Sequence, residues 1–102
     1  MNGHDSQMTL EPGRYVLLHY AYVPDMLERR VGVRPLHLEH ASAAKAKGLL
    51  LFGGAVGDPP AAGLLVFGGD ALAEAEEFAR NDPYNAAGLI TSWRTEPYTV
   101  AI

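Results

Sequence analysis

The stretch LLLFGGAVGDPPAAGLLVF, residues 49–67, decides the fold because it holds two apolar segments joined by a short turn. Leu49 to Val56 and Ala62 to Phe67 have the length and apolar content of buried strands. Gly57-Asp58-Pro59-Pro60 forms a turn too short for a helix, so the second strand runs back along the first. The pair Gly53-Gly54 marks a place where backbone or ligand can approach closely.

The sequence before this stretch predicts a strand and then helical structure. Tyr15 to Tyr22 is rich in aromatic and β-branched residues and apolar on both alternating faces, which is typical of a central strand. Asp25 to Val31 predicts a short helix. Proline suits the first helical position, so a second helix is expected from Pro35 to Lys47, with Gly48 as its C-cap.

The sequence after this stretch predicts one amphipathic helix and a last strand. Four apolar residues recur at helical spacing: Leu72, Ala75, Phe78 and Ala79. Asp70 is placed to cap this helix. Asn81 to Tyr84 breaks this helix, and Leu89 to Val100 is extended, with a bend expected at Pro97.

The resulting order, βαββαβ, predicts an α+β ferredoxin-like fold with an antiparallel sheet and helices on one face. We expect residues 1–13 to be a flexible tail and residues 14–102 to form one domain. The uncovered sheet face carries either Tyr15 and Leu17 or their even-numbered neighbours. Burying that face against a second copy is the simplest solution, so a homodimer is expected.

Composition excludes several kinds of function. The 102-residue chain has no cysteine, which rules out disulfides, thiolate nucleophiles and zinc sites built on Cys. Its net charge is −4 and its eight Lys and Arg are scattered, which argues against nucleic acid as partner. No apolar run is long enough to span a bilayer, and Met1 to Gln7 lacks the order of a signal peptide, so we expect a cytoplasmic protein. The glycine pairs lack phosphate-loop spacing, and no metal or organic cofactor is expected.

Topology places two titratable residues at the same end of the sheet. His37 lies in the first turn after Pro35, and Asp82 directly follows the second predicted helix. A carboxylate facing an imidazole fixes which ring nitrogen carries the proton, and such a His can act as general base or acid. The alternative is structural, because Asp before Pro is also an ordinary N-cap and a lone His in a helix is usually packed or solvated.

Two separated motifs in this sequence resemble those of the YCII-related (YciI-like) family. Arg34-Pro35-Leu36-His37-Leu38 is similar to the pattern R-P-x-H-L, and residues 82–88 are similar to D-P-[YF]-x-x-A-G. The resemblance covers about residues 14–100 and implies the dimeric α+β barrel superfamily, with His37 and Asp82 as the active pair. It supplies no substrate, although some similar proteins are dehydrochlorinases of chlorinated hydroquinones and the superfamily includes muconolactone isomerase. Many relatives have a longer connection between the second and third strands.

Three further residues are candidates for substrate binding. Arg34 could bind an anionic group beside His37, or be a solvated or ion-paired surface residue. Tyr84 is expected to pack as an aromatic lid over the helix junction. His19 could point into the barrel pocket, or be a buried, hydrogen-bonded core residue. His40 could pair with His37 on a metal, but no nearby acids complete a ligand set.

Two functions remain open. The first is a small cofactor-independent enzyme, a lyase or isomerase, in which His37 moves a proton on a small organic molecule and Asp82 orients the ring. The second is a non-catalytic dimeric module that binds a small molecule or serves as an accessory, with the same hydrogen bond holding the helix junction. A pocket opening onto His37 would favour the enzyme.

Overall fold

A computed structural model describes residues 10–102 of the chain, in eight elements. The elements in chain order are β1 (Gly13–Tyr22), α1 (Met26–Arg29), α2 (Arg34–Ala46), β2 (Leu50–Val56), β3 (Ala62–Gly68), α3 (Leu72–Asn81), α4 (Pro83–Ala86) and β4 (Ile90–Val100). Of the predicted tail, residues 1–9 lie outside the described part, and Gly13 already belongs to β1.

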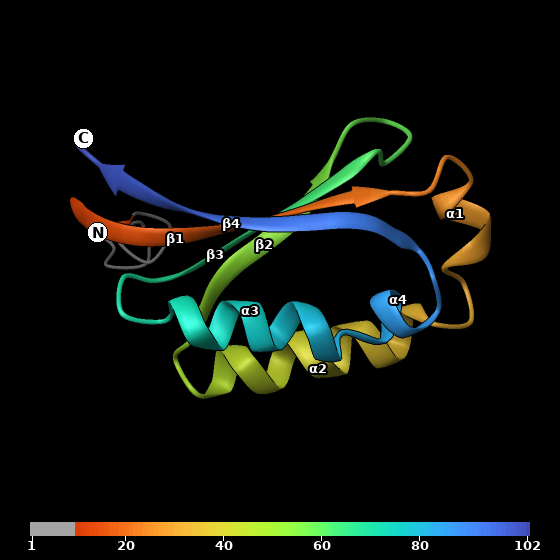
Figure 1. The fold of residues 1–102 in the computed structure, drawn as a ribbon, viewed down its shortest axis with the longest axis horizontal. Coiled ribbons are helices and arrows are strands. Elements are labelled where there is room, and N and C mark those ends of the chain that lie inside the picture. The colour runs from red at the N-terminus through yellow and green to blue at the C-terminus, as the bar shows by residue number, and fades with distance from the viewer. Residues whose placement is uncertain (1–9) are drawn as a thin grey trace, which may run out of the picture.

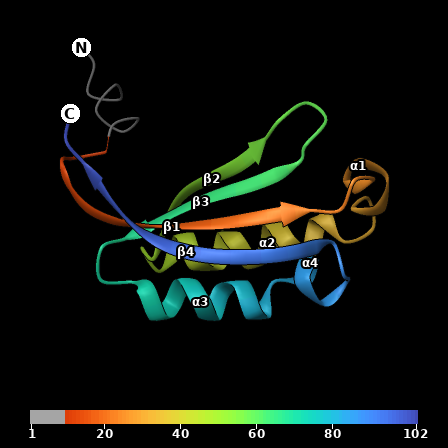
Figure 2. The same cartoon turned by 45° about the horizontal axis from the view of Figure 1, so that its top comes forward.

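The predicted α+β ferredoxin-like architecture is confirmed. The four strands form one sheet in the order β2-β3-β1-β4, with every neighbouring pair antiparallel. Figure 1 shows α2 and α3 side by side on one face of this sheet, with the other face uncovered. The turned view in Figure 2 shows α4 following α3 at the end of the molecule where β1 runs into α1.

The core lies between the sheet and the helices because side chains alternate across each strand. On β1, Val16, Leu18 and Tyr20 are buried on the helix side. They meet Leu65 and Phe67 of β3 in one apolar cluster, to which α3 adds Ala75, Phe78 and Ala79. By contrast, no residue of α2 is fully buried, so one side of that helix is left open to a cleft described below.

Four local predictions differ from the structure. Asp70 does not cap α3: the N-cap is Ala71, without a side-chain cap bond, and Leu72 is exposed rather than part of the apolar face. The segment 81–84, expected only to break a helix, starts the short helix α4, because Pro83 suits its first turn. The β1–β4 register continues through Pro97, which an edge strand tolerates, and shifts instead between Ala21 and Tyr22.

The uncovered sheet face is apolar at its centre. The odd-numbered residues of β1 point to it, and Leu17 lies beside Val66 of β3. Phe52 of β2 and Tyr98 of β4 belong to the same face and are about half exposed, at 50% and 44%. Within residues 10–102, no helix is both long enough and apolar enough to cross a membrane.

Candidate functional site

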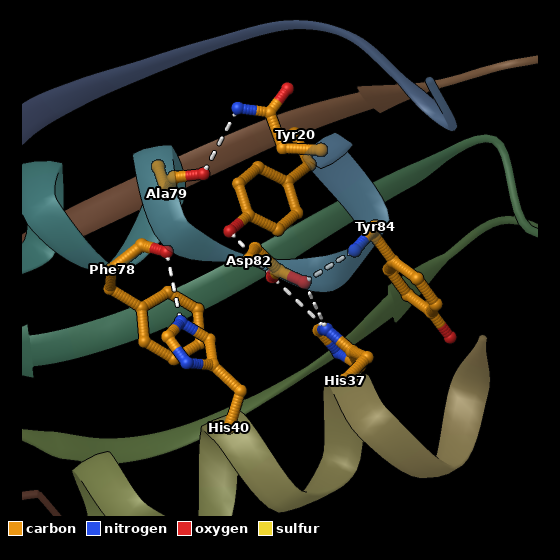
Figure 3. Close-up of polar contacts among 8 residues, drawn as sticks. Tyr20, His37, His40, Phe78, Ala79, Asp82 and Tyr84 are labelled. Carbon is orange, nitrogen blue, oxygen red and sulfur yellow. Dashed lines mark hydrogen bonds and ion pairs between the residues drawn. The ribbon is translucent and has the colours of Figure 1, made fainter. Parts of the chain in front are cut away.

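Asp82 is the fully buried charged residue at the centre of the site (Figure 3). It ends α3 and is the N-cap of α4, so its carboxylate turns back and accepts a hydrogen bond from the backbone N–H of Tyr84 at 2.9 Å. The hydroxyl of Tyr20, which reaches down from β1, donates to its Oδ2 at 2.8 Å. A buried carboxylate needs such donors to replace lost water.

His37 supplies the third donor. It lies one turn into α2, and its Nδ1 is 2.9 Å and 3.0 Å from the two carboxylate oxygens of Asp82. Because a carboxylate only accepts, Nδ1 carries a proton, and in the neutral ring Nε2 then keeps a lone pair. Nε2 makes no hydrogen bond to any described residue. His37 and Asp82 are therefore within hydrogen-bonding distance of each other.

Two tyrosines fix this pair in place. Tyr84 stacks on the imidazole of His37 with ring centres 3.9 Å apart and planes 5° apart, so the predicted lid lies directly on His37. Burial, followed by the nearby Asp82 carboxylate, raises the pKa of Tyr20 well above its ordinary value. Tyr20 therefore remains a neutral donor to Asp82 at all physiological pH values.

His37 opens onto a cleft between α2 and the edge strand β2, with a volume of about 380 Å³. This α2–β2 cleft is lined on one side by a single face of α2, at helical spacing: Arg34, His37, Leu38, Ala41, Ser42 and Lys45. The opposite wall is residues 52–55 of β2, which include the glycine pair. Its size falls within the range typical of small-molecule sites.

Tyr22 and Tyr84 close the end of the α2–β2 cleft near the start of α2. The hydroxyl of Tyr22 occupies the space that a side chain at position 63 would need, which explains why Gly63 is a glycine. Burial raises the pKa of Tyr22 to about 12, although Arg30 and Arg34 act against the rise. Arg30, Arg34 and Tyr22 all line this cleft.

The structure brings together four of the five predicted site residues. His37, Arg34 and Tyr84 line the α2–β2 cleft, and Asp82 lies directly behind His37. His19 is placed elsewhere: it lies on the uncovered face of the sheet, where its Nε2 is 2.6 Å from Oε1 of Glu96. The hydrogen bonds from His19 and from Arg94 lower the pKa of Glu96.

His40 belongs to the other face of α2. Its Nε2 is 3.0 Å from the carbonyl oxygen of Phe78, and its ring stacks on that of Phe78. Among residues 10–102 no group of three or more His, Asp and Glu side chains could hold a metal ion. A shared metal on His37 and His40 therefore has no support in the described part of the chain.

Sequence reasoning missed four residues that belong to this site: Tyr20, Tyr22, Arg30 and Lys45. Tyr20 was assigned to a strand without a role, yet its even-numbered position on β1 places it on the helix side, facing Asp82. Lys45 lies eight and eleven residues after His37 and Arg34, spacings that repeat the same helix face. No sequence pattern pointed to Arg30 or Tyr22. Arg30 is placed by the connection between α1 and α2, and Tyr22 by the register shift that follows Ala21.

Comparison with protein families identifies the chain. The model of the YCII-related domain matches residues 14–98, nearly the whole chain. The chain belongs to the YCII-related family. This confirms the resemblance drawn from the R-P-x-H-L and D-P-Y motifs, whose His37 and Asp82 are the residues that meet in this YCII-related domain. No match was found among curated proteins.

Two solved structures share the fold of this YCII-related protein. One is 5-chloro-2-hydroxyhydroquinone dehydrochlorinase from Burkholderia phenoliruptrix AC1100, in complex with 2,5-dihydroxybenzoquinone. It has 22% identity and a TM-score of 0.70, and the match covers 85% of this chain and 95% of that one. The other is a dimeric ferredoxin-like protein from an uncultured marine organism, with 11% identity and a TM-score of 0.51, covering 99% of this chain and 96% of that one.

Proposed function

We propose that this protein is a small enzyme of the lyase or isomerase type, in which His37 transfers a proton on a small organic molecule bound in the α2–β2 cleft. One observation carries the proposal: Nδ1 of His37 is bound to buried Asp82, while the same ring lines a cleft of substrate size. A purely structural histidine would not need the cleft. The likeness to a dehydrochlorinase adds support for chemistry of this kind.

The proposed mechanism begins with proton abstraction. Nε2 of His37 takes a proton from a carbon or hydroxyl of the substrate, and the electron pair left behind forms a new double bond. In a lyase, the bond to a leaving group then breaks, and the leaving group departs with the electron pair of that bond. In an isomerase, the imidazolium instead returns the proton to another carbon of the substrate. Asp82 does not accept the proton. It holds the ring orientation and stabilises the imidazolium by charge, while Tyr20 and the Tyr84 amide hold Asp82.

Arg34 and Tyr84 are proposed to bind the substrate beside His37, because both line the α2–β2 cleft. His19 has a different proposed role. On the uncovered sheet face it lies among residues that would meet a second subunit, so we assign it to the interface rather than to this cleft.

The proposed assembly is a homodimer formed through the uncovered sheet face. Phe52 and Tyr98 are exposed on this face and Leu17 is partly exposed, which leaves apolar surface that is costly to keep in water. A twofold axis through the face would bury the same residues of both copies. The dimeric state of the marine ferredoxin-like protein supports this arrangement.

Turnover tests the proposal. The first substrate to try is 5-chloro-2-hydroxyhydroquinone, followed by other halogenated or hydroxylated rings, with chloride release and ring absorbance as readouts. His37→Ala and Asp82→Asn should each lower kcat by roughly a hundredfold or more, and the double variant should lose little more.

His40→Ala is the matched control, because it removes an imidazole from the other face of the same helix. It should stay within about threefold of the wild-type kcat, well below the effect of losing a proton-transfer group. Equal turnover by wild type and His37→Ala would contradict the proposal. Ligand binding without turnover on any ring would indicate the non-catalytic binding module instead.

A further inference from the structure

The α2–β2 cleft is basic, although the chain as a whole is acidic. Arg30, Arg34 and Lys45 line it together with His37, and no Asp or Glu of the described residues does so. The net charge of the chain is −4. Three of the eight Lys and Arg therefore line this one cleft, with no acidic residue among its lining residues.

These three cations have no acidic partner within residues 10–102, unlike three of the other basic residues. Arg29, Arg80 and Arg94 each form an ion pair with a neighbouring carboxylate. No ion pair in the described part of the chain involves Arg30, Arg34 or Lys45. Their charge is therefore available to a ligand.

The cations are not evenly placed along the cleft. The backbone N–H of Arg34 donates to the carbonyl of Arg30 at 2.7 Å, so the two arginines lie one turn apart where α1 leads into α2. Arg34 is three residues from His37, whereas Lys45 is eight residues beyond it, about 12 Å along the helix. The arginine pair therefore flanks the proposed proton-transfer group, and Lys45 lies at the far end.

A buried hydroxyl points to a ligand at the same end. Tyr84 lines the cleft and is 1% exposed, and its hydroxyl is the buried side-chain polar atom of residues 10–102 that lacks a hydrogen-bond partner. Figure 3 shows this hydroxyl pointing away from Asp82. Buried polar groups are normally satisfied, so an orphaned hydroxyl in a cleft wall calls for a partner.

We infer that the substrate of the proposed reaction is a small organic anion, whose carboxylate or phenolate oxygens bind between Arg30 and Arg34, beside the Tyr84 hydroxyl. This inference rests on the proposed function for its reacting group and names the class of molecule that function acts on. Bidentate or paired guanidinium contacts suit planar oxyanions. The anion would hold the reacting carbon beside Nε2, at the edge of the His37 ring.

A pair of probes of nearly the same shape but different charge tests the inference: 2,5-dihydroxybenzoate and its neutral amide, 2,5-dihydroxybenzamide. Each is titrated into the full chain and its Kd measured by calorimetry or NMR. We expect the acid to bind at least about tenfold more tightly than the amide. Arg30→Gln and Arg34→Gln should each remove most of that preference, and Lys45→Gln should remove less.

Lys47→Gln is the matched control, because it deletes a positive charge just past α2 from a residue outside the cleft. It should leave the preference for the acid within about twofold, the small effect of a screened surface charge. Equal binding of acid and amide, no binding of either at millimolar concentration, or an unchanged preference in both arginine variants would overturn the inference.

The readout is binding, so it is independent of turnover. Preference for the acid in a protein that shows no His37-dependent turnover would sustain the anion site and defeat the proposed function alone. His37-dependent turnover of neutral substrates without any preference for the acid would support the proposed function and defeat the anion site alone.

Discussion

The Asp82 carboxylate is a buried charge held by three donors, from Tyr20, His37 and the Tyr84 amide. Asp82→Asn keeps the shape of the side chain but replaces one acceptor oxygen with an amide NH2, which only donates, so at least one donor loses its partner. We expect the free energy of unfolding to fall by about 1–3 kcal/mol, measured by urea denaturation.

Asp70→Asn is the control for this change, because Asp70 is exposed and does not cap α3. It should alter the free energy of unfolding by no more than about 0.5 kcal/mol. An Asp82→Asn variant as stable as this control would show that the three hydrogen bonds do not hold the carboxylate as described.

The buried tyrosines predict a loss of stability at alkaline pH. Burial raises the pKa of Tyr22 from 10.0 to about 12. Below pH 10 both the folded and the unfolded chain hold this proton, so the shift has no effect there. Above pH 10 the unfolded chain releases it first, so unfolding becomes easier, by up to about 1.4 kcal/mol per pH unit until the folded pKa is reached.

Tyr22→Phe should therefore flatten the fall in unfolding free energy between pH 10 and 12. The wild-type chain, which keeps the Tyr22 hydroxyl, is the comparison. Urea unfolding on either side of pH 10 measures both. An identical alkaline slope in Tyr22→Phe and wild type would argue against the partial burial of Tyr22 beside the core.

At the scale of elements, α2 presents one face to the cleft and the other to α3. Ser42 lies on the cleft face and is exposed, so Ser42→Trp should fill part of the cleft without disturbing the core. The affinity for 2,5-dihydroxybenzoate should fall by about tenfold or more, because bulk now occupies the ligand's space.

Ala46→Trp provides the control on the same helix, at an exposed position that does not line the cleft. Both variants should keep their unfolding free energy within about 0.5 kcal/mol of wild type, as is usual for surface positions. Equal loss of binding in both would mean that the ligand does not lie along the Ser42 face.

The elements also show how far the sequence could predict the structure. The order of strands and helices along the chain follows from local signals, so the meeting of His37 with Asp82 could be foreseen from the topology and the two motifs. The short helix α4 could not be foreseen, because the sequence Asp82-Pro83-Tyr84 is equally typical of a segment that ends a helix. The roles of Tyr20 and Arg30 depend on tertiary packing across segments distant in sequence, which no local pattern encodes.

His19 shows the same limit of prediction from sequence. Its place in β1 was clear, but only the register decides which face it points to. Opposite Leu64 and Arg94, it lies on the uncovered face and bonds to Glu96, away from the helices that carry His37.

At the scale of the whole molecule, the uncovered sheet face predicts the assembly. Leu17 lies at its apolar centre, so Leu17→Glu should place a charge inside the proposed interface and shift the protein from dimer to monomer. Sedimentation at micromolar concentration should report twice the chain mass for wild type and the chain mass for the variant.

Leu36→Glu is the matched control, because Leu36 is exposed on α2, remote from that face. It should sediment as wild type does. A wild-type protein that sediments as a monomer, or a dimer unaffected by Leu17→Glu, would contradict assembly through the uncovered face.

The protonation pattern of the His37 ring tests the central claim most directly, because Nε2 can abstract a proton only if Nδ1 holds the ring proton against Asp82. Nitrogen-15 NMR of histidine-labelled protein at neutral pH distinguishes the two ring nitrogens. The account predicts the Nδ1–H form with an unprotonated Nε2 in wild type, and loss of that preference in Asp82→Asn. A His37 ring protonated at Nε2 alone in the wild-type protein would contradict it.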